Sequence, residues 1–124
     1  TDPKKVILAL KPRPAQATEA QAGLARVTLQ HGDLQQAEQL AFRLVAYMQQ
    51  DGAQGFELPM LVYLTCAKIF QAVGDKSRLQ QILENARREL QATADRIGDA
   101  SWKDTFLCAV PENRALLALD SAQR

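Results

Sequence analysis

The sequence has few of the side chains from which catalytic and metal sites are built. It contains one histidine, His31, and two cysteines, Cys66 and Cys108, which stand far apart among apolar neighbours. It also lacks a glycine-rich phosphate loop, a GxSxG elbow and an HExxH pair. Because such chemistry needs several groups that converge, we expect no enzyme activity, no bound metal and no cofactor. We expect the two cysteines to be buried thiols in the reducing cytoplasm, and His31 to be a surface residue near a helix end.

An excess of one charge sign and a long apolar run are absent as well. Lys and Arg number 15, against 14 for Asp and Glu, so no net field attracts nucleic acid or anionic lipid. The longest strongly apolar stretch without a charge, residues 58–67, has about half the length needed to cross a bilayer. The sequence therefore predicts neither a nucleic-acid partner nor a membrane-spanning segment.

What the sequence does have is helical periodicity. Apolar residues recur at spacings of three and four, and no segment alternates apolar and polar residues as a half-buried strand does. We expect long helices over residues 15–31, 34–48, 57–73 and 77–97, separated by loops that contain glycine. Asp33, Ser77 and Ser101 are the expected N-caps of three helices. The fold class is therefore all-α.

The two helical hairpins resemble each other at an offset of 42 residues. Matched pairs include Leu24 with Cys66, Ala25 with Ala67, Val27 with Ile69, Gly32-Asp33 with Gly74-Asp75, and Leu40 with Ile82. A Gly-Asp turn between two helices, repeated along a chain, is typical of helix-pair solenoids. We expect an antiparallel helix-pair solenoid in which the first helix of each pair lines the inner, concave face.

These residues resemble the tetratricopeptide (TPR) family. The resemblance depends on Leu24-Ala25, Gly32-Asp33 and Ala37 in the first unit and on Ala67, Phe70 and Gly74-Asp75 in the second. Thr28 and Leu79 depart from the family pattern, no proline closes either unit, and the period exceeds the usual length of about 34 residues. The chain is more similar to the longer, degenerate repeats of large bacterial signalling proteins, of the ATPase-linked transcriptional activator or cyclase type.

The end of the chain strengthens that resemblance. Residues 106–107 (FL), 110–114 (VPENR) and 116–117 (LL) are similar to the segment that closes helical arrays in those proteins. The resemblance implies a TPR-like protein-interaction or signal-relay domain at the C-terminus of a larger cytoplasmic bacterial regulator. Its partner is then a protein, a peptide or another domain of the parent chain.

Three segments follow from this interpretation. Residues 1–14 form an N-terminal cut end or linker, residues 15–98 form two TPR-like hairpins, and residues 99–124 form C-terminal capping helices. In the cap, Pro111 starts the last helix, and the side chains expected to cover the open end of the preceding hairpin are Trp102, Phe106, Leu116 and Leu117.

The candidate partner-binding residues lie along one side of the inner helices: Glu19, Arg26, Gln30, Lys68 and Gln71. Solvated polar residues of no special function are the alternative for each of them. Two other functions stay open at this point. Apolar faces around residues 6–10 and the first helix favour a homodimerisation scaffold. The second alternative is a small-molecule sensor, whose interhelical pocket we expect near Tyr63, Phe70 and Trp102.

Overall fold

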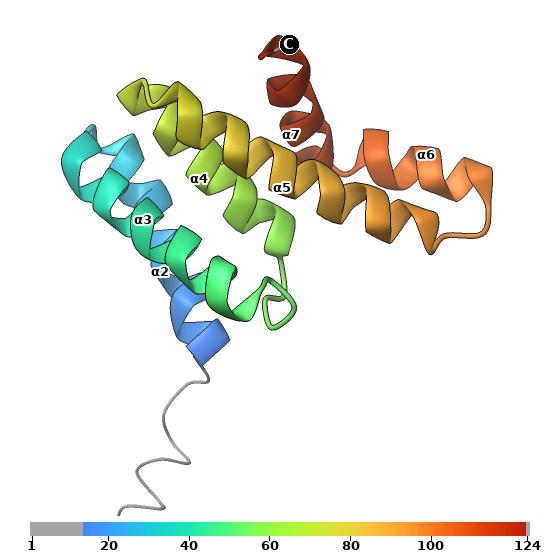
Figure 1. Ribbon diagram of the computed structural model, residues 1–124, viewed down its shortest axis with the longest axis horizontal. Helices are drawn as coiled ribbons and strands as arrows, with labels where there is room; N and C mark the ends of the chain where they lie inside the picture. The colour runs from blue at the N-terminus through green and yellow to red at the C-terminus, as the bar shows by residue number, and fades with distance from the viewer. Residues whose placement is uncertain (1–13, 124) are drawn as a thin grey trace, which may run out of the picture.

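The computed structural model describes residues 14–123, which fold into six helices joined by short turns (Figure 1). The expected segment 1–14 lies, apart from Pro14, outside the described residues. The prediction of an all-helical chain is confirmed. The helices are α2 (Pro14–Gln30), α3 (Leu34–Asp51), α4 (Pro59–Val73), α5 (Lys76–Asp95), α6 (Ala100–Ala109) and α7 (Pro111–Ala122).

Aspartates cap three of the helices. The Asp33 carboxylate accepts a backbone N–H from the residue three positions on, at 3.2 Å, as the sequence predicted. Asp75 caps α5 in the same way at 3.1 Å, and Asp99 caps α6. The prediction of Ser77 and Ser101 as caps was therefore wrong by two residues. An ionised carboxylate is favoured there because it accepts the free N–H groups and also meets the positive end of the helix dipole.

The turn between the two helices of each hairpin repeats at the offset found in the sequence. Gly32 has φ 81° and Gly74 has φ 79°, a left-handed conformation that glycine adopts without steric cost. The next backbone N–H, of Asp33, donates to the Thr28 carbonyl at 3.2 Å, and that of Asp75 donates to the Phe70 carbonyl at 3.0 Å. The repeat is thus present in the backbone geometry as well as in the residue types.

Helix α4 lies at the centre of the molecule. It packs against α2, α3, α5 and α7, and Figure 1 shows it between the α2–α3 hairpin and the pair α5 and α7. Eight of its 15 residues are buried, which matches an apolar sequence with no single polar face. Around it, the core is continued by small and aliphatic residues: Ala22, Ala25, Leu40, Ala41, Leu44, Leu79, Ile82, Leu83, Ala86 and Leu90.

The last two helices close the α4–α5 end. Pro111 is the first residue of α7, Leu116 is buried, and Phe106 and Leu117 pack partly buried against the core. Trp102 is 71 % exposed, so the prediction that it covers the hairpin was wrong. The reason is the position of α6, which lies beside the C-terminal half of α5 (Figure 1) and has no buried residue.

The two cysteines differ in their surroundings. Cys66 is buried in the core, whereas Cys108 on α6 is exposed, so the prediction of two buried thiols was wrong for Cys108. The cause is again that α6 packs on one side only. Burial raises the pKa of the Cys66 thiol to about 12. That thiol therefore remains protonated and unreactive at neutral pH.

Candidate functional site

A groove runs between α2 and α4, the first helices of the two hairpins. It consists of two cavities of about 350 Å³ and about 180 Å³ that share Arg26 and Leu61. We call it the inner groove. Its other lining residues include Gln16, Glu19, Ala20, Leu29, Gln30, Glu57, Leu58, Leu64, Thr65 and Lys68.

The structure brings four of the five predicted partner-binding residues to this groove. Arg26, Gln30 and Lys68 line the smaller cavity, and Glu19 lines the larger one together with Arg26. Gln71 is exposed near the end of α4 and lines neither cavity. Three polar side chains from two helices thus surround one small cavity.

Glu19 performs a structural task. One of its carboxylate oxygens accepts the backbone N–H of Glu57 at 3.0 Å, and the other accepts that of Leu58 at 2.8 Å. Leu58 is the N-cap residue of α4 and offers no side-chain acceptor of its own. Glu19 therefore caps α4 from the neighbouring hairpin. Each carboxylate oxygen keeps a second lone pair, so the predicted partner contact of Glu19 stays a prediction beside this structural role.

Arg26 is held in place by a neutral group. Its Nη1 donates to the hydroxyl of Thr65 at 3.1 Å, and Thr65, itself buried, donates to the Leu61 carbonyl at 2.7 Å. Thr65 fixes the guanidinium without cancelling its charge. Lys68 lies one helical turn further along α4 and is exposed.

Among the residues that the structure describes, Arg26 and Lys68 form no ion pair with a carboxylate. Within residues 14–123 the ion pairs join Arg78 with Asp75, Arg88 with Glu84 and Lys103 with Asp95, and none of them includes Arg26 or Lys68. At one end of the inner groove stand two cations that form no ion pair within the described part of the chain. Its floor there is apolar, formed by Leu29, Leu61 and Leu64.

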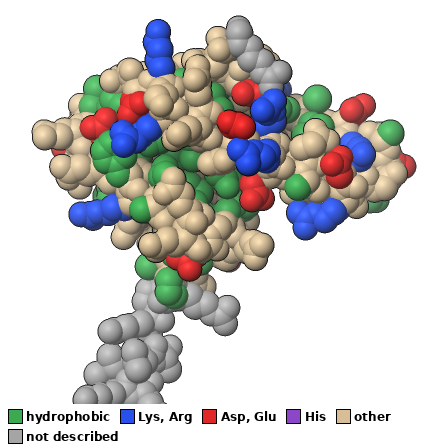
Figure 2. Space-filling view, in the orientation of Figure 1, with side chains coloured by type: hydrophobic (Ala, Val, Ile, Leu, Met, Phe, Trp, Pro, Cys, Tyr) green, Lys and Arg blue, Asp and Glu red, His purple; other side chains and the backbone are tan. Residues whose placement is uncertain are grey.

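A second, outer groove separates α3 from α5, with α4 as its floor. It consists of cavities of about 480 Å³ and about 290 Å³ that share Val45, Gln49, Ile82 and Asn85. Figure 2 shows hydrophobic side chains along this channel, with charged side chains on its borders. The sequence pattern did not predict this groove, because its walls come from the second helices of the two hairpins.

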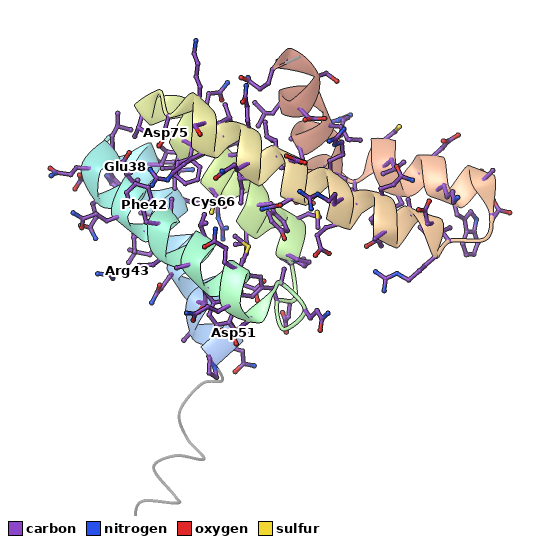
Figure 3. All side chains as sticks on the ribbon, viewed as in Figure 1. Glu38, Phe42, Arg43, Asp51, Cys66 and Asp75 are labelled. Carbon is purple, nitrogen blue, oxygen red and sulfur yellow. The ribbon has the colours of Figure 1, made fainter. Side chains whose placement is uncertain are left out.

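The arginines of the outer groove are already paired. Arg78 forms an ion pair with Asp75 at 3.0 Å and also lies 4.4 Å above the centre of the Phe42 ring. Phe42 and Asp75 lie at the same end of this groove (Figure 3). Arg88 pairs with Glu84 at 3.1 Å. Within residues 14–123 the arginines of the outer groove are therefore ion-paired, unlike Arg26 and Lys68 of the inner groove.

The aromatic residues predicted for a sensor pocket do not meet. Tyr63 lines the larger outer cavity, Phe70 lines the smaller one, and Trp102 on α6 lines neither. Burial, assisted by the charge of Glu89, raises the pKa of the Tyr63 phenol to about 12. Tyr63 is therefore a neutral hydrogen-bonding group at physiological pH.

The described part of the chain contains no cluster of three or more His, Cys, Asp or Glu that could hold a metal ion. None of its helices combines the length and the apolar character that crossing a membrane requires. Comparisons with known protein families, with curated proteins and with solved structures found no match.

Proposed function

We propose that the chain is a TPR-like protein-interaction module and that its inner groove binds an acidic peptide segment of a partner protein. The observation that carries the proposal is the convergence of Arg26 and Lys68, which form no ion pair within residues 14–123, beside an apolar floor. A partner's carboxylate supplies the missing charge, and a neighbouring apolar side chain covers Leu29, Leu61 and Leu64.

The size of the cavity beside the two cations and the fixed position of Arg26 favour a peptide side chain over a small metabolite there. The cavity beside the two cations measures about 180 Å³, below the range of about 300–1,000 Å³ that is typical of small-molecule sites. It accommodates one side chain of an extended segment. Because Thr65 already orients Arg26, binding loses little side-chain entropy there.

We also propose that this module is part of a larger protein. The 42-residue repeat of the Gly-Asp turn and the closing segment with VPENR support a module of a larger cytoplasmic bacterial regulator. In such a protein the helical array binds a partner or relays a signal, and another domain performs the output. The residues here supply recognition and no chemistry.

Lys68→Glu tests the proposal most cleanly, because Lys68 is exposed and takes part in none of the ion pairs of the described residues. A library of fluorescent decapeptides that combine one Leu or Phe with acidic or basic neighbours is screened by anisotropy. We expect acidic members to bind, and Lys68→Glu to weaken them at least about tenfold, a loss of about 1.4 kcal/mol. The affinity should also fall as salt increases.

Lys76→Glu is the matched control, since Lys76 is an equally exposed lysine at the start of α5, away from the groove. It should leave the affinity unchanged within about twofold, because its charge lies outside the groove. The proposal is wrong if no acidic peptide binds, or if Lys68→Glu and Lys76→Glu have the same effect.

A further inference from the structure

The larger cavity of the outer groove has the dimensions of a small-molecule site. Its volume is about 480 Å³, inside the range of about 300–1,000 Å³ that is typical of such sites. Helices α3 and α5 form its walls, and Tyr63 of α4 lies at its floor. Its apolar lining consists of Val45, Met48, Ile82 and Ala92. The cavity therefore offers a small molecule apolar contact from two helices and a polar group below.

The hydroxyl of Tyr63 opens on this cavity without a partner. Tyr63 is 5 % exposed, and its hydroxyl forms no hydrogen bond within residues 14–123. In that part of the chain, every fully buried side-chain nitrogen or oxygen has a hydrogen-bond partner. The unpartnered hydroxyl is therefore accessible, and the space that Tyr63 lines is the larger outer cavity. A buried aromatic side chain thus presents one polar atom to the cavity.

The carboxylate of Glu89 belongs to the same cavity. Burial raises the pKa of the Tyr63 phenol to about 12 and the charge of Glu89 contributes to this rise, so the two groups interact. Glu89 is exposed and takes part in none of the ion pairs of the described residues. Arg88 also lines the cavity, but it is paired with Glu84 at 3.1 Å. Within residues 14–123 the cavity therefore carries a negative charge that no ion pair balances.

Two amide side chains complete the polar lining. Gln49 of α3 and Asn85 of α5 border both outer cavities, and neither forms a side-chain hydrogen bond within the described residues. An amide oxygen, a phenolic oxygen and a carboxylate all accept hydrogen bonds. A ligand group with several N–H donors and a positive charge matches this set of acceptors.

We infer that the larger outer cavity binds a small organic amine with an aromatic body. Its ammonium group donates to the Tyr63 hydroxyl and to the Glu89 carboxylate. Its ring packs on Val45 and Met48, because a methionine sulfur makes favourable contacts with an aromatic ring. Glu89 repels an anion of the same shape, and a neutral analogue lacks the charge-assisted hydrogen bond.

Tryptamine, tryptophol and indoleacetate test the inference, because they present an amine, an alcohol and a carboxylate on the same indole ring. Each is titrated into the ¹⁵N-labelled full chain up to about 5 mM, and amide chemical shifts are followed. We expect tryptamine to bind with a dissociation constant of about 0.1–1 mM, as the usual affinity per atom gives for a ligand of this size. Tryptophol should bind at least about tenfold more weakly, and indoleacetate should not bind.

Glu89→Gln removes the charge from an exposed position and should weaken tryptamine binding at least about tenfold. Glu38→Gln is the matched control, because Glu38 of α3 lines neither outer cavity, and it should change the affinity by less than about twofold.

Tyr63→Phe keeps the buried ring and removes the hydroxyl, so tryptamine binding should weaken about threefold to tenfold. Tyr47→Phe is its control. The Tyr47 ring stacks on Phe56 with a centroid distance of 5.6 Å and lines neither outer cavity, so the affinity should not change.

Three results would overturn the inference: no tryptamine binding up to about 5 mM, equal affinities for the three indoles, or unchanged tryptamine affinity in Glu89→Gln. Lys68→Glu should leave tryptamine binding as it is, because Lys68 lines the inner groove and not the outer one. The amine site and the peptide site therefore stand or fall separately.

Discussion

At the scale of single residues, a side-chain amide joins the last two helices. Asn113 is 1 % exposed, and its Nδ2 donates to the Phe106 carbonyl of α6 at 2.8 Å. That carbonyl lies in the last turn of α6, where no N–H of the same helix is available to it. Trp102, the largest side chain of α6, contributes far less, because it is 71 % exposed. Burial and hydrogen bonding, more than side-chain size, decide which residue holds this end together.

Asn113→Ala should lower the free energy of unfolding by about 1–3 kcal/mol, because it leaves the partly buried Phe106 carbonyl without its donor. Trp102→Ala should lower it by less than about 1 kcal/mol, as for other exposed positions. Urea unfolding followed by circular dichroism measures both. Phe70→Ala, in the fully buried core, serves as the positive control. Equal losses for Trp102→Ala and Asn113→Ala would contradict this assignment.

At the scale of helices, Glu19 and Arg26 of α2 make polar contacts with the second hairpin. Glu19 accepts the N–H groups of Glu57 and Leu58. Arg26, which lies two helical turns beyond Glu19 on α2, donates to the hydroxyl of Thr65 on α4. The turns within each hairpin are local and were predicted from the Gly-Asp pairs. The contacts between hairpins join residues 38 and 39 positions apart, so spacing along the chain cannot reveal them.

Glu19→Gln should destabilise the fold by about 0.5–2 kcal/mol, the range for loss of a helix cap, because a neutral amide oxygen accepts more weakly than a carboxylate. Amide hydrogen exchange should accelerate first at Glu57 and Leu58. Glu38→Gln, on α3 and without a hydrogen bond to the start of α4, is the control. Unchanged exchange at those two amides in the Glu19 variant would show that the cap is unimportant.

At the scale of the whole molecule, two grooves lie on either side of the central helix α4. Among residues 14–123 the two cations of the inner groove form no ion pair and those of the outer groove are paired, although the outer cavities are larger. The sequence predicted the all-helical class. It also predicted that Arg26, Gln30 and Lys68 share one face, because helical spacing and the 42-residue repeat are local patterns in the sequence. The exposure of Trp102 and Cys108 depends on where α6 packs, and the outer groove depends on how α3 lies beside α5. Neither is encoded in a local pattern.

The central claim is that the inner groove is the partner-binding site. Titration of the ¹⁵N-labelled chain with the tightest acidic peptide from the screen, followed by amide chemical shifts, tests it most directly. The largest shifts should fall on Arg26–Gln30 of α2 and Leu61–Lys68 of α4, and they should disappear in Lys68→Glu. Shifts concentrated along α3 and α5 at Val45, Gln49, Ile82 and Asn85 would contradict the claim and place the site in the outer groove.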